Sequence, residues 1–358
     1  METKNKRVVI AMSGGVDSSV AAYLLKEQGY DVVGISMRLW SYDPDTTHGC
    51  CTPDDLYDAR RVADQLQIPY YVFNFEQKFE GAVVDQFIES YRVGETPNPC
   101  VRCNIDIKFD LLLQRAEELG ADFLATGHYA RLIKDDQGII HLKRAVDLQK
   151  DQSYFLFGMN QEQLDKLMFP LGDMTKPEVR AIGEKAGILT SQKKDSQEIC
   201  FVPTDYKKFV RDRIDEKNII KGNLVDETGK VLGKHEGIHE YTIGQRRGIE
   251  IPTTLPMYVS NIDKTTGNIT VGDEASLMKK EFVIKELRYT DKPVQIDQTY
   301  DVKIRSRFEP AKAVVKKVGE TVTLSFVEPQ KSITPGQAAV IYQGDTVVGG
   351  GWIDQVVA

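Results

Sequence analysis

The cysteines are the residues of this chain with the widest chemical range, and the sequence contains five of them. Cys100 and Cys103 stand in a C-x-x-C spacing inside TPNPCVRCN, residues 96–104, which its prolines predict to be a loop. Such a pair can supply half of a zinc site, a redox couple, ligands of a cluster or the working thiols of an enzyme. A closed structural zinc site needs four ligands, and the chain has no second C-x-x-C. Spacing alone leaves the other interpretations open.

A second chemical feature is the segment AMSGGVDSS, which follows a short apolar run. Gly14 and Gly15 have no Cβ, so the backbone there can approach an oxyanion closely. The helix that follows offers unpaired N–H groups and the positive end of its dipole. The segment is neither a Walker A loop nor a dinucleotide fingerprint, so it predicts another kind of phosphate-binding loop, with Asp17 as a partner for Mg²⁺. The residues expected to bind the nucleotide here are Ala11, Met12, Ser13, Gly14, Gly15, Val16, Asp17, Ser18 and Ser19.

Alternating strands and helices must position this loop. The β-branched run 7–12 predicts a buried strand, and the segments after it alternate in type up to about residue 205. This alternation predicts a Rossmann-like α/β domain, with a parallel sheet covered by helices. Met37 and Gly127 fall at the carboxyl ends of predicted strands, where such sheets bind ligands. The predicted strands are 30–40, 70–75 and 121–128, and the predicted helices are 16–28, 54–68 and 108–119.

The pattern changes in the second half of the chain. The segments DETGK and DKTTGN are typical hairpin turns between short strands, and from about residue 280 apolar residues alternate with period two. The sequence therefore predicts an α/β domain over residues 1–205, a small mixed or β domain over 206–276 and a β barrel over 277–358.

Composition excludes some classes of protein. No apolar run approaches the ~20 residues of a membrane span, and the N-terminus lacks a signal-peptide core. Five cysteines are too sparse for a secreted disulfide framework, so we expect a reducing, cytoplasmic location. The net charge of −7 argues against a protein that coats nucleic acid by charge alone.

The segment SGGVDSS resembles the PP-loop of the ATP pyrophosphatase superfamily, whose members activate a carbonyl oxygen as an adenylate. Together with further segments along the chain, it is similar to the bacterial tRNA-specific 2-thiouridylase family. The resemblance implies ATP-dependent 2-thiolation of the wobble uridine (U34) of tRNA, with ATP and Mg²⁺ as cofactors. It also implies a catalytic first domain and a tRNA-binding central domain. The segments that carry it are TPNPCVRCN, ATGHYAR, KDQSYFL, DSQEICF and YTIGQRRG.

By this resemblance, Cys200 carries a persulfide and Cys103 is the nucleophile that releases its sulfur. A transient Cys103–Cys200 disulfide would remain, as in thiol–disulfide exchange. Cys100 varies within the family, which implies that it is dispensable. Cys50 and Cys51 are interpreted as ordinary thiols. The persulfide requires a sulfur-relay donor protein or a cysteine desulfurase as partner.

The resemblance also implies contacts with tRNA, and basic clusters at 206–213, 244–248 and 303–317 favour RNA backbone contacts. The family often has tyrosine where this chain has Ser306, so the contact of that residue differs here. The residues implied to meet the tRNA or its target base are Asn98, Pro99, Cys100, Lys150, Asp151, Gln152, Arg305, Ser306 and Arg307.

Alternatives remain. The thiolates of Cys100, Cys103 and Cys200 could hold a [4Fe-4S] cluster with one open iron site, as in related tRNA thiolases. A PP-loop amide or C–N ligase shares the loop but needs no paired thiols, and a non-catalytic RNA-binding protein would not release pyrophosphate.

Residues 235–239, HEGIH, match the H-E-x-x-H zinc-protease pattern. That pattern needs a helix that brings both histidines to one face, but Gly237 interrupts it and no apolar stripe extends it. We therefore expect no metalloprotease, and we interpret His235 and His239 as surface or tRNA-facing residues.

Overall fold

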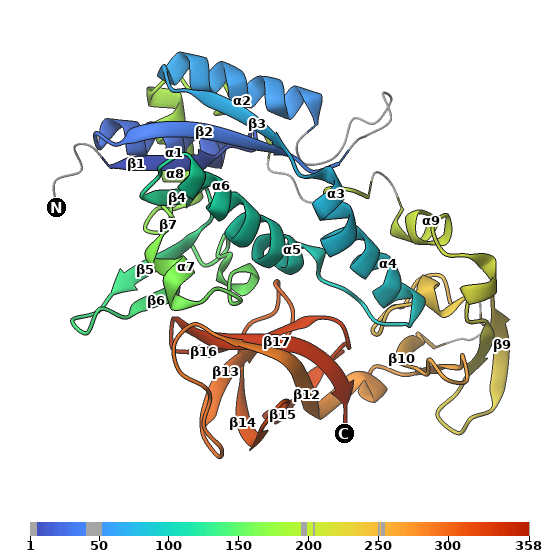
Figure 1. The fold of residues 1–358 in the computed structure, drawn as a ribbon. Helices are drawn as coiled ribbons and strands as arrows, with labels where there is room; N and C mark the ends of the chain where they lie inside the picture. Colours follow the sequence, from blue (N-terminus) through green and yellow to red (C-terminus); the bar gives the residue numbers. More distant parts are fainter. Residues whose placement is uncertain are drawn as a thin grey trace. The chain divides into compact units, whose positions relative to one another are not determined.

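The computed structural model describes residues 6–40, 52–194, 199–202, 205–249, 251 and 255–357 (Figure 1). Cys50, Cys51 and residues 195–198 of the DSQEICF motif lie outside the described residues. The chain divides into two compact units, which are described separately below. Within the described ranges, no helix has both the length and the apolar character needed to cross a membrane. The first unit comprises Met1–Val83, Cys100–Pro203 and Asp345–Val347, and the second comprises Val84–Pro99, Thr204–Gly344 and Val348–Ala358.

A five-stranded sheet forms the centre of the first unit, in the order β3-β2-β1-β4-β7. Every pair of neighbouring strands is parallel, which confirms the predicted α/β architecture. The strands are β1 (Arg7–Ala11), β2 (Asp31–Arg38), β3 (Tyr70–Asn74), β4 (Phe123–Thr126) and β7 (Leu167–Met168).

Both faces of this sheet are covered. Val8 and Ile10 of β1 belong to the apolar cluster that includes the helices α1, α2 and α8. Val9, between them in the sequence, points to the opposite face and is equally buried. Figure 1 shows α1 and α2 on one side of the strands and α6 on the other. The helices are α1 (Val16–Glu27), α2 (Pro53–Leu66), α6 (Leu112–Glu118) and α8 (Lys176–Lys185).

Two local expectations for this unit were wrong. The strand–helix alternation does not continue to residue 205, because the chain after β4 forms the antiparallel hairpin of β5 (Ala130–Lys134) and β6 (Ile140–Arg144). The segment TPNPCVRCN is not entirely a loop, since Pro99 begins a helix and places Cys100 and Cys103 on it. Proline suits a first helical turn, where its missing N–H has no intrahelical partner. The helical stretch consists of α5 (Pro99–Arg102), the π-helical segment η2 (Cys103–Leu111) and α6.

Shorter helices complete this part of the chain. They are α3 (Glu76–Phe79), the π-helical η1 (Glu80–Val84), the 3₁₀ turn η3 (Ser153–Phe155) and α7 (Gln161–Asp165).

The second unit contains a small mixed sheet in the order β10-β11-β8-β9. The two predicted hairpins are confirmed, because β8 pairs antiparallel with β9 and β10 pairs antiparallel with β11. The two hairpins join through parallel pairing of β11 with β8. The strands are β8 (Gly222–Val225), β9 (Val231–His235), β10 (Tyr258–Ile262) and β11 (Ile269–Gly272).

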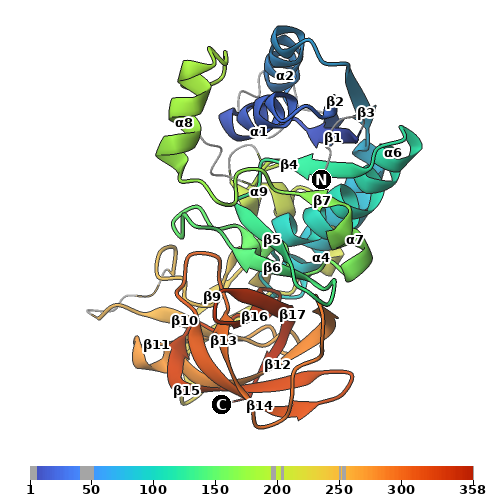
Figure 2. The same cartoon turned by 90° about the vertical axis from the view of Figure 1, so that its left-hand side faces the viewer.

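The C-terminal strands close into a six-stranded barrel, because β12 pairs with both β15 and β17 (Figure 2). The alternation of Val322, Leu324 and Phe326 places all three in the barrel core, as predicted. The strands are β12 (Met278–Tyr289), β13 (Thr299–Lys303), β14 (Ala311–Val318), β15 (Val322–Lys331), β16 (Ala338–Gln343) and β17 (Thr346–Val356). The short helices of this unit are α4 (Asp85–Arg92), α9 (Tyr206–Arg211), η4 (Glu216–Asn218), η5 (Ile238–Glu240) and η6 (Ala275–Leu277).

The HEGIH segment is not one helix, since β9 ends at His235 and η5 begins at Ile238. The expectation of exposed histidines was wrong, because His235 and His239 are only 6% and 2% exposed. Nε2 of His235 lies 2.8 Å from the carbonyl oxygen of Gly267, and its ring packs on Tyr241. The apolar core of the mixed sheet, not the polarity of the side chains, decides this burial.

These two histidines predict a pH-dependent stability. Burial lowers the pKa of both, and for His239 the positive charges of Arg211 and Lys207 add to it while Glu240 opposes it. The unfolded chain takes up protons near the ordinary histidine pKa, whereas the folded chain does not. The contribution of these two histidines to the free energy of unfolding should therefore be complete above about pH 6.5. It should decrease as the pH falls below that value.

This fall can be measured by chemical denaturation between pH 7 and pH 5. The variant His239→Gln should show a shallower pH dependence than the native chain. An identical slope in both proteins would contradict the assignment.

Candidate active site

The phosphate-binding loop lies between β1 and α1, and glycine is required in it. Gly14 has φ +70°, and a Cβ there would lie 2.2 Å from the carbonyl oxygen of Asp55 in α2. Gly15 is the N-cap of α1, so the first N–H groups of that helix face the loop. The backbone of the loop is therefore packed directly on the first turn of α2.

The serines of the loop have distinct positions. Ser18 Oγ accepts from the Ser13 N–H (3.1 Å) and lies 3.3 Å from the Gly15 carbonyl oxygen. Ser19 Oγ donates to the same carbonyl (2.8 Å) and accepts from Thr190 Oγ1 (3.0 Å). Ser18 and Ser19 are buried, whereas Ser13 is exposed. The two buried hydroxyls thus brace the loop, and Ser13 presents the hydroxyl that a ligand can reach.

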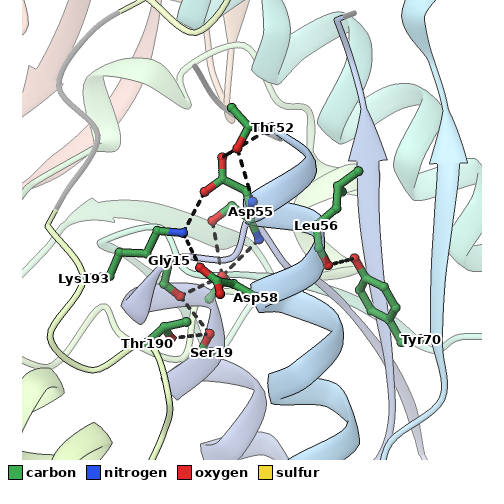
Figure 3. Close-up of polar contacts among 11 residues, drawn as sticks. Gly15, Ser19, Thr52, Asp55, Leu56, Asp58, Tyr70, Thr190 and Lys193 are labelled. Carbon is green, nitrogen blue, oxygen red and sulfur yellow. Dashed lines mark hydrogen bonds and ion pairs between the residues drawn. The ribbon is translucent and has the colours of Figure 1, made fainter. Parts of the chain in front are cut away.

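A lysine that the sequence did not single out binds the first turns of α2, the helix on which the loop packs (Figure 3). Lys193 Nζ contacts Asp55 Oδ1 (2.8 Å) and Asp58 Oδ2 (2.6 Å), both on α2. Burial opposes its charge, but the hydrogen bonds to the two carboxylates outweigh burial and raise its pKa. Thr52 caps α2 and also bonds to Asp55. No spacing rule relates Lys193 to α2, so only the structure could reveal this support.

The predicted residues at the carboxyl ends of β2 and β4 lie at the same edge of the sheet as the loop. A Cβ on Gly127 would lie 2.7 Å from the backbone nitrogen of Ser18. Met37 is buried near the end of β2. His128 Nδ1 lies 2.7 Å from Thr126 Oγ1, and burial, aided by the charge of Lys108, holds its pKa well below the usual range. The imidazole is therefore neutral at neutral pH, and its ring packs against Phe109 and Phe169.

Asp17 has partners that the sequence did not predict. Lys176 Nζ lies 2.7 Å from its Oδ1 and 2.8 Å from its Oδ2. The Tyr129 hydroxyl donates to Oδ1 at 2.8 Å. A Mg²⁺ ion on this carboxylate would stand beside an ammonium of like sign, so the arrangement does not fit Asp17 as a magnesium ligand.

The KDQ segment, residues 150–152, is organised by internal hydrogen bonds. The Asp151 side chain is 1% exposed and accepts from Arg144 Nε (3.1 Å) and from the Ser153 N–H (3.1 Å). Gln152 Oε1 accepts from the Tyr129 N–H (2.9 Å). Lys150 is half-buried. In this arrangement Asp151 shapes the segment rather than facing outward.

Asn104 connects this segment to the helix of Cys103. Its Nδ2 donates to the Phe155 carbonyl oxygen (3.0 Å), and the Phe155 N–H donates to the Gln152 carbonyl oxygen (2.9 Å). Backbone and side-chain bonds thus run from Asp17 through Tyr129 and Gln152 to the residue that follows Cys103.

The three described cysteines have different environments. Cys103 is 8% exposed and begins η2, where the wider π-helical turn is typical of functional sites. Cys100 is exposed and Cys200 is half-buried. Phe201, beside Cys200, packs on Phe79 of α3, with ring centroids 5.6 Å apart.

The fit of an iron–sulfur cluster can be tested on the same residues. Across the described residues, which include Cys100, Cys103 and Cys200, no three His, Cys, Asp or Glu side chains are arranged to hold a metal ion. Among the described residues, the three thiols are therefore not a preassembled ligand set.

The remaining candidates belong to the second unit. Arg305 Nη2 donates to Thr334 Oγ1 (2.7 Å) and to the Ile243 carbonyl oxygen (3.2 Å), so its guanidinium serves the interior of the unit. Arg307 is exposed, whereas Ser306 is half-buried. Asn98 is half-buried and Pro99 is buried.

A contact that sequence reasoning missed holds the segment before Asn98. Gln337 Nε2 donates to the carbonyl oxygens of Thr96 and Pro97, both at 3.0 Å.

Comparison with known proteins identifies three family models along the chain. Residues 6–204 match the tRNA methyl transferase HUP domain, residues 207–273 the tRNA methyl transferase PRC-barrel domain, and residues 279–353 the aminomethyltransferase beta-barrel domain. Among solved structures, a U34-tRNA thiolase NcsA from Methanococcus maripaludis with its [4Fe-4S] cluster is 21% identical. It matches 59% of this chain and 64% of its own, with a TM-score of 0.36.

Curated relatives match nearly the whole chain. A tRNA-specific 2-thiouridylase MnmA of Geotalea uraniireducens is 49% identical over 99% of this chain and 96% of its own length. The protein of the same name from Geobacter metallireducens is 48% identical over 99% of this chain and 98% of its own.

Proposed function

Because the chain belongs to the MnmA family of tRNA-specific 2-thiouridylases, we propose that it transfers sulfur to C2 of the wobble uridine, U34, of tRNA in an ATP-dependent reaction. The observation that carries the proposal is that the phosphate-binding loop, Cys103 and Cys200 belong to one compact unit. We also propose that the catalytic domain ends at residue 205 and that the central domain ends at residue 276.

The first step is activation of the base. The C2 carbonyl of uridine is conjugated with two nitrogens and is a poor electrophile. Attack of its oxygen on the α-phosphate of ATP releases pyrophosphate and leaves an adenylate, whose AMP is a good leaving group. The N–H groups at the start of α1 and the exposed Ser13 are suited to hold the phosphates. Ala11, Met37 and Gly127 border the same edge of the sheet.

Sulfur transfer then uses two thiols. The Cys103 thiolate attacks the Sγ of the Cys200 persulfide, which breaks its S–S bond and forms a Cys103–Cys200 disulfide. The released hydrosulfide attacks C2 and expels AMP. An external dithiol, or two monothiols, supplies the two electrons that reduce the disulfide, and a sulfur donor protein or cysteine desulfurase reloads Cys200. This chemistry requires the reducing cytoplasm, where thiols persist.

Several residues are proposed to meet the tRNA. Gln152 is linked through Phe155 and Asn104 to the helix of Cys103, Lys150 belongs to the same segment as Gln152, and Asn98 precedes that helix in the sequence. The exposed Arg307 is available for phosphate. Asp151 would act by shaping its segment, and Arg305 by holding the interior of its unit. Mg²⁺ would accompany the ATP phosphates and neutralise their charge.

The test is reconstitution with ATP, unmodified tRNA and a persulfide donor. Pyrophosphate release and 2-thiouridine, identified by mass spectrometry at U34, are both expected. Pyrophosphate without a thiolated base would favour an amide or C–N ligase, and tRNA binding without pyrophosphate would favour a non-catalytic RNA-binding protein.

The basic segment GQRRG gives a prediction about the partner. Arg246 and Arg247 are exposed in the second unit. The double variant Arg246→Ala/Arg247→Ala should bind tRNA more weakly, and its salt dependence, the slope of log K against log salt, should become shallower by up to about 2.

Filter binding at several salt concentrations measures this slope. Lys185→Ala, an exposed substitution on α8, serves as control and should leave the slope unchanged. A double variant with native affinity and slope would show that this segment does not contact the RNA backbone.

A further inference from the structure

Asp17 lies in the first turn of α1, the helix that follows the phosphate-binding loop, and it pairs with Lys176, the first residue of α8. The Asp17 side chain is 31% exposed and the Lys176 side chain 9% exposed. An isolated carboxylate at this place would repel the polyphosphate of a bound nucleotide, because both are anionic. The phosphate-binding loop therefore carries a charge that opposes its own ligand unless that charge is balanced.

Lys176 is held so that it balances this charge. Its ammonium contacts both carboxylate oxygens of Asp17, and its backbone N–H donates to Asp147 Oδ2 (3.0 Å). The helix α8 starts at Lys176, with Thr175 and Glu178 forming a capping box around it. The Tyr129 hydroxyl fixes the orientation of the Asp17 carboxylate by a further bond to Oδ1.

Stability alone gives little reason for a charged pair here. Replacing a buried ion pair with apolar side chains is often neutral or stabilising. Removing one partner, by contrast, leaves an uncompensated charge. Asp17 lies within one helical turn of Gly14 and Gly15. The Lys176 ammonium that balances its charge can therefore affect the binding of a nucleotide at the loop.

We propose that Lys176 is a positioning residue for ATP, which neutralises Asp17 so that the loop accepts the polyphosphate without a metal ion on that carboxylate. This inference rests on the proposed function, since it assigns a role within the same nucleotide site. It replaces the sequence-based expectation that Asp17 is the partner of Mg²⁺.

The test is ATP affinity, measured calorimetrically with EDTA and again with Mg²⁺. Lys176→Met keeps the length of the side chain but leaves Asp17 unbalanced, so ATP should bind about ten- to a hundredfold more weakly in EDTA. Lys176→Arg keeps the charge and should stay within a few-fold of the native affinity. Lys185→Ala, exposed on the same helix, is the matched control and should leave the affinity unchanged.

A rescue experiment separates this role from a merely structural one. Adding Asp17→Asn to Lys176→Met removes the unbalanced carboxylate, so the double variant should bind ATP more tightly than Lys176→Met in EDTA. Asp17→Asn alone should bind ATP in EDTA at least as tightly as the native chain, which keeps the test valid if Lys176→Met does not fold.

Two outcomes would overturn the inference: native affinity in Lys176→Met, or a double variant no tighter than the single one. Failure of the native chain to bind ATP at all would instead overturn the proposed function.

Discussion

Cys103→Ser and Cys200→Ser are each expected to abolish thiolation of U34. A hydroxyl can neither carry a sulfane sulfur nor attack a persulfide, so no 2-thiouridine should form. The adenylation step uses neither thiol, and each variant should still release pyrophosphate in a single turnover with tRNA. Mass spectrometry of the digested tRNA, alongside a pyrophosphate assay, measures the two steps separately.

Cys100→Ser is the matched control, since it removes a thiol three residues from Cys103 on the same helix. Cys100 is exposed, whereas Cys103 is buried, and the persulfide route gives Cys100 no task. This variant should retain substantial thiolation. The assay is made without oxygen, and iron is quantified in every sample.

The rival cluster mechanism predicts a different result for the same variant. If Cys100, Cys103 and Cys200 ligate a [4Fe-4S] cluster, losing any one thiolate should remove iron and activity together. An inactive, iron-free Cys100→Ser beside an active, iron-containing parent would establish the cluster route.

Gly14→Ala is expected to have the second large effect, because two independent penalties act at this position. The backbone has φ +70°, and the added Cβ would lie 2.2 Å from the carbonyl oxygen and 2.8 Å from the carbonyl carbon of Asp55. These neighbours are backbone atoms, so the loop or α2 must move. Strain and overpacking together should lower the free energy of unfolding by about 2–5 kcal/mol. Because the start of α1 shifts with the loop, ATP binding should be lost.

Gly229→Ala separates the two penalties. Gly229 also has a left-handed backbone (φ +87°), but a Cβ there would meet nothing within 4 Å. This variant should lose only about 1–2 kcal/mol from backbone strain and keep native ATP affinity. Denaturation and calorimetry measure both quantities. If Gly14→Ala bound ATP as tightly as Gly229→Ala, the packing of the loop on α2 would not matter for binding.

The sequence by itself determined the features that depend on near neighbours in the chain. A β-branched run followed by SGGVDSS predicted a loop between a strand and a helix, because glycines and a helix start act within a few residues. The turns DETGK and DKTTGN predicted two hairpins, and the period-two alternation around Leu324 predicted a barrel strand. The roles of Cys103 and Cys200 came only from a resemblance to a family, since spacing left several chemistries open.

The tertiary structure decided which polar groups meet across long sequence separations. Lys176 binds Asp17, and Lys193 binds Asp55, although neither pair follows a helical or strand period. His235 and His239 are buried because the mixed sheet packs around them, which their polarity did not predict. Periodicity reports the face on which a residue lies, whereas the partner of a charge depends on how distant elements fold together. The charged partner of Asp17 could therefore not be predicted from the sequence alone.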